Sequence, residues 1–203
     1  MQATSETRPP AALAEPFWNV PNSLTMGRLG LSIVVFTLVG HAWYWAALAV
    51  FVVAAITDAL DGYAARRLGQ STALGRQLDP LVDKVIVCGA FIYLLTVPGD
   101  TGLAPWMVTT IVVRELLIQG LRSHLEGGGQ AFGARLAGKL KTVAQCLSIS
   151  AILVALGLRP APHWLMARDV LTWSAVGLTV YSGLGYFALA IPKLRGRSPS
   201  SLP

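Results

Sequence analysis

The chain has 203 residues, of which 54% are hydrophobic and 13% are charged. This composition is too apolar for an ordinary soluble domain of this length and predicts a polytopic membrane protein. The net charge is +6, but lysine and arginine cluster between apolar blocks, which fits loops on one membrane face and argues against a nucleic-acid-binding protein.

The predicted elements follow one another along the chain without a break large enough for a second domain. Residues 1–16 are rich in proline, alanine and polar side chains and lack the basic start of a signal peptide, so we expect a flexible tail. Six apolar segments follow, each able to supply the ~20 residues of a membrane-spanning helix; they cover residues 22–40, 43–66, 77–97, 103–122, 138–157 and 170–191. We therefore predict an all-α fold with six transmembrane helices in one domain, residues 17–192, and a second tail, residues 193–203.

The charges between these segments predict the orientation in the membrane. One side holds both tails and the loops after the second and fourth segments, and its cations are Arg8, Arg66, Arg67, Arg76, Arg122, Arg135, Lys193, Arg195 and Arg197. The opposite loops carry only Arg159 and Arg168. By the positive-inside rule, both termini are expected to face the cytoplasm of the cell (inner) membrane. An aromatic belt is expected near the opposite helix ends, from Trp43, Trp45, Trp106 and Trp164.

Four aspartates interrupt this apolar pattern. An aspartate at the bilayer centre costs about 2.5–3.5 kcal/mol on insertion scales, so each must be compensated. Asp58 and Asp61 are three residues apart, and Asp79 and Asp83 are four apart, so each pair shares one helix face. The short segment between the two helices allows both faces to meet at a common cavity.

Divalent metal ions explain this carboxylate group best. Carboxylate oxygens are the hard ligands that Mg²⁺ or Mn²⁺ prefers. Two such ions balance four carboxylates and leave positions open for the phosphates of a substrate. The alternative is ordinary ion pairing at the membrane edge with Arg66, Arg67, Arg76 and Lys84. Four carboxylates at regular helical spacing favour the metal site.

The run Asp58-x2-Asp61-Gly62-x2-Ala65-Arg66-x8-Gly75-x3-Asp79-x3-Asp83 resembles the signature of the CDP-alcohol phosphatidyltransferases at every fixed position. The resemblance implies a homodimeric membrane enzyme that transfers a phosphatidyl group from a CDP-linked lipid to an alcohol and releases CMP. It implies metal ligation by all four aspartates, with Asp83 also acting as general base. It also implies a CDP pocket formed by Gly62, Ala65, Arg66 and Gly75, with Thr25 and Arg28 near the nucleotide.

A second group of charges predicts how the acceptor is recognised. Arg114 and Glu115 lie in the apolar fourth segment, and Arg122 follows near the same helix face. A buried arginine needs an anion, which is either Glu115 in a structural pair or an anionic substrate. Lys139 and Lys141 add two cations at the start of the fifth segment, where a lysine can also simply extend to the interface. The four cations predict a pocket for a phosphate on the acceptor.

These motifs, Val113-Arg114-Glu115 and Gly-Lys-x-Lys-Thr among them, resemble the bacterial phosphatidylglycerophosphate synthases of the same family. The implied donor is CDP-diacylglycerol, and the implied acceptor is glycerol 3-phosphate. Cardiolipin synthases and phosphatidylinositol-phosphate synthases of the family remain alternatives. Outside the family, a cation transporter also uses intramembrane carboxylates, although here all four lie near one membrane face.

Overall fold

The computed structural model describes residues 20–68, 73–127, 136–158 and 162–195. Within these ranges the chain forms six helices and no strand, which confirms the all-α prediction for this part of the chain. The helices are α1 (Val20–Gly40), α2 (Tyr44–Leu68), α3 (Ala73–Thr96), α4 (Pro105–Gly127), α5 (Leu136–Gly157) and α6 (Pro162–Arg195).

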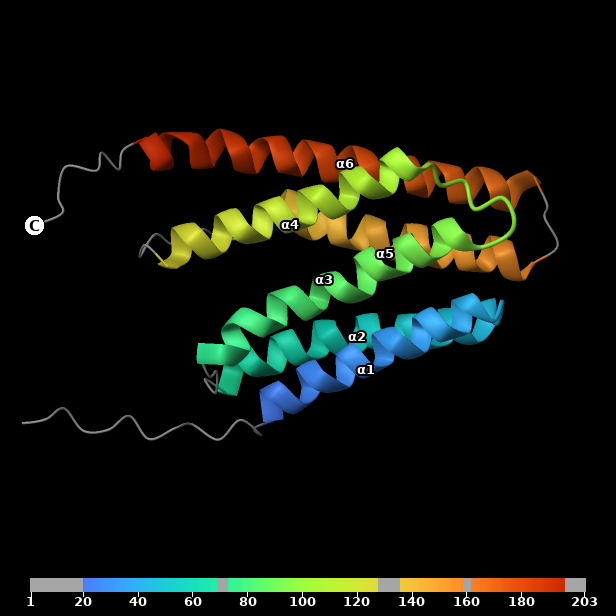
Figure 1. Cartoon of the computed structure of the whole chain (residues 1–203), viewed down its shortest axis with the longest axis horizontal. Coiled ribbons are helices and arrows are strands. Elements are labelled where there is room, and N and C mark those ends of the chain that lie inside the picture. Colours follow the sequence, from blue (N-terminus) through green and yellow to red (C-terminus); the bar gives the residue numbers. More distant parts are fainter. Residues whose placement is uncertain (1–19, 69–72, 128–135, 159–161, 196–203) are drawn as a thin grey trace, which may run out of the picture.

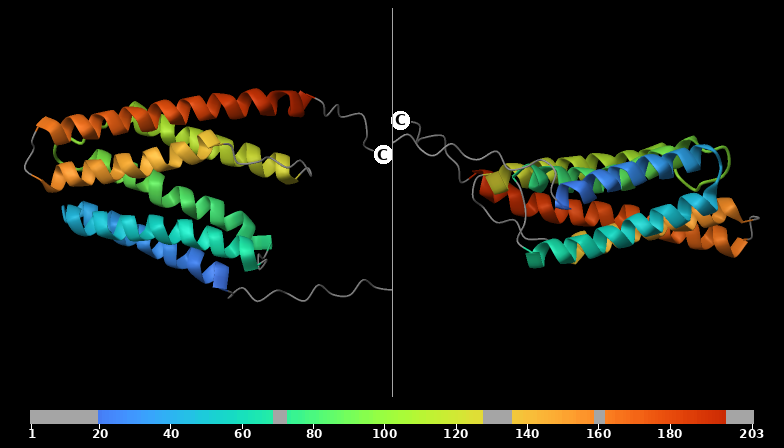
Figure 2. Two further views of the ribbon diagram at one scale, coloured as in Figure 1. Left: turned by 180° about the vertical axis from the view of Figure 1, so that it is seen from behind. Right: turned by 90° about the horizontal axis from the view of Figure 1, so that it is seen from below.

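The helices run roughly along the long axis of the molecule (Figure 1). α1 begins and α6 ends at the same end of the bundle, at the left in Figure 1, where α2 and α4 also end and α3 and α5 begin. The view from below in Figure 2 separates two layers, one of α1, α3 and α4 and the other of α2, α5 and α6. Helix contacts agree with this arrangement, since α3 packs against α1 and α4, and α5 packs against α2 and α6.

An apolar core fills the space between the layers. Its fully buried large side chains include Val35, Phe51, Phe91, Leu94, Ile111, Ile149, Ile152 and Leu153. α1 and α3 approach each other closely, since a Cβ atom added to Gly89 would lie 2.2 Å from Cζ of Phe36. Glycine at this position therefore lets the ring of Phe36 rest against the backbone of α3.

The turn between α1 and α2 closes by helix-capping hydrogen bonds. The amide of Trp43 donates to the carbonyl of Leu38 at 2.9 Å, and the amide of Ala42 donates to that of Val39 at 3.0 Å. This pair of bonds is the Schellman pattern, which places one residue in the left-handed region. Ala42 takes that role with a φ of 58°, so the chain reverses within a few residues.

The surface of the bundle is apolar as well as its core, unlike that of a soluble protein. Large apolar side chains cover the outside, as at Ile33, Leu116 and Tyr181, which are 60%, 56% and 70% exposed. Charged and polar side chains are buried instead, including Glu115 and Lys141 at 1% and 2% exposed. Burying charge and exposing apolar surface are both costly in water, whereas lipid outside the bundle removes the second cost.

Two helical stretches of the described chain are long and apolar enough to cross a membrane, Gly138–Gly157 and Pro162–Ile191. The apolar parts of three other helices are shorter: Thr25–Gly40, Tyr44–Thr57 and Lys84–Thr96. α2 and α3 continue beyond these stretches through the signature residues.

Candidate active site

The signature residues lie on α2 and α3. Asp58 and Asp61 are in the last part of α2, and Asp79 and Asp83 are in the first part of α3. These parts of the two helices lie at the same end of the bundle (Figure 1). The side chains of the four aspartates fall outside the described part of the structure. The described side chains contain no group of three or more histidine, cysteine or acidic residues suited to a metal.

The signature residues that are predicted to bind the nucleotide are also described only by their positions on the helices. Gly62, Ala65 and Arg66 continue the last turns of α2, and Gly75 lies in the first turn of α3. Their helical positions are described, but the side chains of Ala65 and Arg66 are not. The predicted nucleotide pocket therefore stays a prediction at these four positions.

A cavity of about 590 Å³ lies beside the signature helices. Most of its wall is apolar, with Phe51 and Ile56 from α2, Ile86 from α3, and Val143 and Leu147 from α5. Its polar lining residues are Arg28, Lys84, Glu115, Thr142, Gln145 and Ser150. An apolar chamber with a few convergent polar groups is typical of a ligand site.

The first helix contributes the two polar residues that the amino-terminal motif predicts near the nucleotide. Thr25 and Arg28 are 4% and 9% exposed, and Arg28 lines the cavity. Ser32 follows one turn later and donates a hydrogen bond to the carbonyl of Arg28 at 2.9 Å. The structure thus brings Arg28 to the same chamber as Lys84 of α3 and Glu115 of α4.

Glu115 on α4 is the centre of a buried charge cluster. Its Oε2 atom lies 2.8 Å from Nζ of Lys84 on α3, and its Oε1 atom contacts Nζ of Lys141 on α5. The side-chain amide of Gln145 donates to Oε1 at 3.4 Å. Arg114 approaches the same oxygen at 3.4 Å through one guanidinium nitrogen. Three cations from three helices therefore surround one carboxylate.

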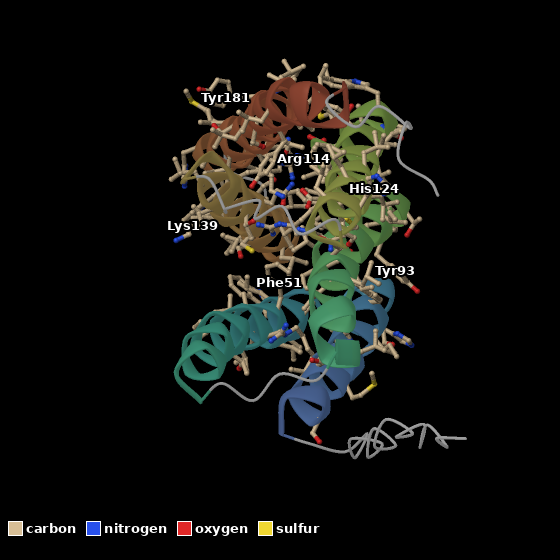
Figure 3. The ribbon with its side chains drawn as sticks, turned by 90° about the vertical axis from the view of Figure 1, so that its left-hand side faces the viewer. Phe51, Tyr93, Arg114, His124, Lys139 and Tyr181 are labelled. Atoms are coloured by element: carbon tan, nitrogen blue, oxygen red, sulfur yellow. The ribbon has the colours of Figure 1, made fainter. Side chains whose placement is uncertain are left out.

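Arg114 is fixed mainly by contacts with α6. Its second terminal nitrogen donates to the hydroxyl of Ser182 at 3.0 Å, and its guanidinium carbon lies 5.6 Å from the ring centre of Tyr186. Gly183 leaves room for the arginine, because an added Cβ would lie 3.1 Å from its Cγ. Figure 3 shows Arg114 directed into the space between α4, α5 and α6. Its contacts include the structural pair with Glu115 that the sequence allowed.

The other predicted cations of the acceptor pocket differ in position. Lys141 joins the Glu115 cluster and is buried, whereas Lys139 is exposed and points outwards in Figure 3. Two residues along a helix are separated by about 200° around its axis, so both lysines of the run cannot face one cavity in the same way. Arg122 is half-buried near the end of α4. Phosphate binding by these residues stays a prediction.

The site also contains polar residues that were not assigned from the sequence. Gln145 lies one turn after Lys141 and also donates to the hydroxyl of Thr179 at 3.0 Å, which ties α5 to α6. Ser148 and Thr172 make a second hydrogen bond between these helices, also at 3.0 Å. Gln145 could have been found from the sequence, because it is a polar residue within an apolar segment and lies one turn after Lys141, a predicted ligand of the acceptor phosphate. No sequence spacing could have paired Lys84 with Glu115.

Comparison with known proteins shows the family of the chain. The profile of the CDP-alcohol phosphatidyltransferase family matches residues 18–181. The chain is 36% identical over 190 residues to the CDP-diacylglycerol–glycerol-3-phosphate 3-phosphatidyltransferase of Bacillus subtilis (strain 168), covering 84% of this chain and 94% of the relative. The proteins of the same name from Pseudomonas fluorescens and Escherichia coli (strain K12) are 37% and 35% identical. Those matches cover 87% and 85% of this chain and 92% and 95% of the relatives. The chain belongs to the CDP-alcohol phosphatidyltransferase family and is an enzyme of that class.

Proposed function

We propose that this enzyme transfers the phosphatidyl group of CDP-diacylglycerol to glycerol 3-phosphate, giving phosphatidylglycerol phosphate and CMP. The observation that carries the proposal is the buried cluster of Lys84, Lys141 and Arg114 around one carboxylate, next to the apolar cavity. A cluster with excess positive charge suits a phosphorylated acceptor, and an apolar wall suits a lipid donor. The names of the relatives support the same donor and acceptor.

Divalent metal ions, Mg²⁺ or Mn²⁺ and two in number, complete the proposed site. The residue types fit them, because four aspartates occupy positions on the parts of α2 and α3 that lie at one end of the bundle. Asp58, Asp61, Asp79 and Asp83 would hold the ions. When bound, the ions neutralise the diphosphate of the donor and stabilise the charge that develops on departing CMP.

The residues of the chain divide the remaining work. Asp83 takes the proton from the primary hydroxyl of glycerol 3-phosphate, and the hydroxyl oxygen forms a bond to the phosphatidyl phosphorus. The bond from that phosphorus to the oxygen of CMP breaks, and CMP leaves with the electron pair. Thr25 and Arg28 bind near the nucleotide, together with the signature positions Gly62, Ala65, Arg66 and Gly75.

Recognition of the acceptor falls to the cations of α4 and α5. Lys141 is buried and Arg114 is nearly so, with a side chain 10% exposed, and both contact Glu115. Arg122 and Lys139 lie towards the helix ends on the proposed cytoplasmic side. A fixed pair of buried cations selects a phosphate over a neutral hydroxyl group, since each can donate several hydrogen bonds to its oxygens. An acceptor that lacks a phosphate leaves these charges unbalanced.

The proposed setting is the cell membrane, crossed by all six helices, with both termini and the active site on the cytoplasmic side. Each helix has at least 21 residues, enough to span a hydrocarbon layer of about 30 Å. Four exposed tryptophans, Trp43, Trp45, Trp106 and Trp164, lie at the end opposite the signature, as an aromatic belt requires. The exposed Trp173 lies further along α6, beside Trp106. A homodimer, which the family implies, is part of the proposal, and the mass of the purified protein in detergent tests it.

A CMP-release assay tests the reaction. Purified protein in detergent or lipid is given CDP-diacylglycerol with Mg²⁺ or Mn²⁺ and one acceptor at a time: glycerol 3-phosphate, phosphatidylglycerol, inositol phosphate or glycerol. We expect CMP release with glycerol 3-phosphate and little with the others. If CMP were released strongly with only phosphatidylglycerol or only inositol phosphate, that compound would be the acceptor in place of glycerol 3-phosphate. If none of the acceptors caused release, the result would favour a transporter.

Removal of metal tests the carboxylate site. Excess chelator should abolish CMP release, and added Mg²⁺ or Mn²⁺ should restore it, because the donor diphosphate then loses and regains its counter-charge. The melting temperature of the protein in chelator is also measured, so that loss of metal can be distinguished from unfolding. Full turnover in chelator would contradict the proposed chemistry.

A further inference from the structure

One carboxylate connects the two halves of the proposed site. Glu115 is 1% exposed, and each of its oxygens contacts a lysine from a different helix, Lys84 from α3 and Lys141 from α5. α3 also carries the last two aspartates of the signature, and α5 carries the lysine run. Glu115 therefore links the metal-bearing helix to the helix of the acceptor cations.

The two lysines depend on this carboxylate to remain close together. Two ammonium groups in a low-dielectric interior repel each other strongly, and a carboxylate between them reverses that interaction. Arg114 adds a third cation, so the cluster holds more positive than negative charge. The carboxylate sets the geometry of the cations without neutralising all of them.

Glu115 is itself held in position from a third side. Gln145 on α5 donates to its Oε1 atom at 3.4 Å and to the hydroxyl of Thr179 on α6 at 3.0 Å. Thr179 in turn donates to the carbonyl of Ala175 at 2.6 Å. This chain of hydrogen bonds anchors the carboxylate to α6, so its position does not depend on the lysines alone.

From this geometry we infer that Glu115 is a positioning residue, which fixes Lys84 at the cavity wall and Lys141 directly beside that wall, so that α5 presents a cation to the acceptor phosphate. An ammonium group has three donors, so Lys141 keeps its contact with Glu115 while it donates to a phosphate. The same carboxylate holds α3 through Lys84, the residue after Asp83, and so sets the distance between the general base and the acceptor cations. The inference rests on the proposed function.

A purely structural ion pair makes a different prediction. If Glu115 only cross-links helices, its loss lowers the melting temperature and the fraction of active protein, while the KM values of the remaining enzyme stay unchanged. If it positions the lysines, the folded variant binds the acceptor more weakly and the donor normally.

The test compares Glu115→Gln with the wild-type enzyme and with the matched control Asp169→Asn. Glutamine keeps the shape and one oxygen but removes the charge. Asp169 also faces a cation, Arg168 at 2.8 Å, but at the far end of the bundle. Each protein is purified to a single size-exclusion peak, its melting temperature is recorded, and KM for both substrates is measured by CMP release.

We expect Glu115→Gln to raise the KM for glycerol 3-phosphate by about tenfold or more and to change the donor KM by less than about twofold. Glu115→Asp, which restores the charge, should recover part of the loss, and Asp169→Asn should match the wild type. Gln145→Met keeps the carboxylate but removes its anchor, so it should shift the acceptor KM in the same direction and serves if Glu115→Gln does not fold.

A double-mutant cycle closes the test. Because Glu115 acts through Lys141, adding Glu115→Gln to Lys141→Met should raise the acceptor KM no further than Lys141→Met alone. Additive effects, or an unchanged acceptor KM in folded Glu115→Gln, would overturn the inference and leave the proposed function intact. If the wild-type enzyme itself releases no CMP with glycerol 3-phosphate, the proposed function fails first.

Discussion

The single residues of this chain balance buried charge in two ways. Glu115 finds its counter-charges inside the protein, on Lys84 and Lys141. Lys84 is thereby engaged with α4, although it follows Asp83 directly in the chain. We expect the four signature aspartates to find theirs outside the protein, in bound metal ions. The contrast separates a carboxylate with a positioning role from carboxylates that meet the substrate.

Asp83→Asn tests the general base. The amide cannot accept the proton of the acceptor hydroxyl, so CMP release should fall roughly 10²–10⁴-fold, the usual contribution of a general base. Binding of CDP-diacylglycerol, followed by calorimetry in the presence of Mg²⁺, should be largely kept because three other ligands remain. Turnover within about twofold of the wild-type rate would remove Asp83 from the chemistry.

Sequence reasoning reached the right residue types in the charge cluster but not all of their partners. Arg114 beside Glu115 was visible as a pair because the two are neighbours in one helix. The contact of Glu115 with Lys141 depends on how α4 and α5 face each other, which is set by the packing of whole helices. Lys139 and Lys141 appeared equivalent in the sequence, and only the structure separates the exposed lysine from the buried one.

At the scale of elements, the contact of α1 with α3 shows how closely the helices fit. The ring of Phe36 rests on Gly89 and also stacks on Tyr93, with ring centres 4.9 Å apart. Tyr93 prevents the ring from simply turning away. Small residues at such crossings let the backbones of membrane helices approach each other.

Gly89→Ala should therefore destabilise the protein. The added methyl group overlaps the ring of Phe36, and overpacking of this kind costs about 1–3 kcal/mol. Thermal unfolding in detergent should show a lower melting temperature. Gly177→Ala on α6 is the control, since an added Cβ there meets nothing within 4 Å, and it should leave the melting temperature unchanged or slightly higher. Equal melting temperatures for Gly89→Ala and the wild type would mean that α1 and α3 can separate without cost.

The loop between α3 and α4 is held by a polar clasp. Arg168 on α6 donates to the backbone carbonyl of Asp100 at 2.6 Å and to its carboxylate at 3.2 Å. The amide of Gly102 donates to the same carboxylate at 2.9 Å. Gly102 has a φ of +69°, and an added Cβ would lie 2.7 Å from Nε of Arg168, so both its conformation and the space require glycine.

This clasp should weaken in acid. The amide of Gly102 lowers the pKa of the Asp100 carboxyl below its ordinary value of 3.8, and Arg168 adds to that effect. A carboxyl whose pKa is lower in the folded state stabilises that state above the ordinary pKa and loses the effect as the pH falls through the folded value. Asp100→Asn should thus lower stability by about 1 kcal/mol or less at neutral pH, because the carboxylate is largely exposed.

Melting temperatures of Asp100→Asn and the wild type, measured from neutral pH to below pH 3.8, check this expectation. The difference between the two proteins should shrink as the pH falls, because the wild-type carboxyl becomes neutral. A constant difference over the whole range would show that the charge of Asp100 does not contribute.

The helix boundaries show what an apolar pattern can and cannot predict. Two predicted spans, residues 22–40 and 138–157, lie within α1 and α5 and end where these helices end. Polar residues and turns limit those helices. The last span was expected to begin at residue 170, but α6 already begins at Pro162. Its first turns carry the clasp residue Arg168, and a helix can continue past the apolar segment wherever it has such polar partners.

At the scale of the whole molecule, the six helices form two layers (Figure 2) that enclose an apolar core with one buried charge cluster and expose further apolar side chains on the outside. The length of the apolar segments in the sequence predicted the helices, but it could not predict which helices share a layer. All six segments are apolar around most of their circumference, so their periodicity does not tell which face meets a neighbour and which meets lipid. Glu115 and Lys141 were the exception, because these charged residues within apolar segments are buried and mark the interior face of α4 and α5.

Labelling of introduced cysteines tests the proposed topology. Pro98 and Ser123 are both exposed and lie at opposite ends of the bundle, next to α3 and within the last turns of α4. Each is changed to cysteine in a background where Cys88 and Cys146 are alanine, and activity is checked first. With the signature end in the cytoplasm, a membrane-impermeant maleimide should label the cysteine at position 98 in spheroplasts and that at position 123 only in inverted vesicles. Labelling of both from one side would mean that α4 does not cross the membrane, because most of that helix lies between the two positions.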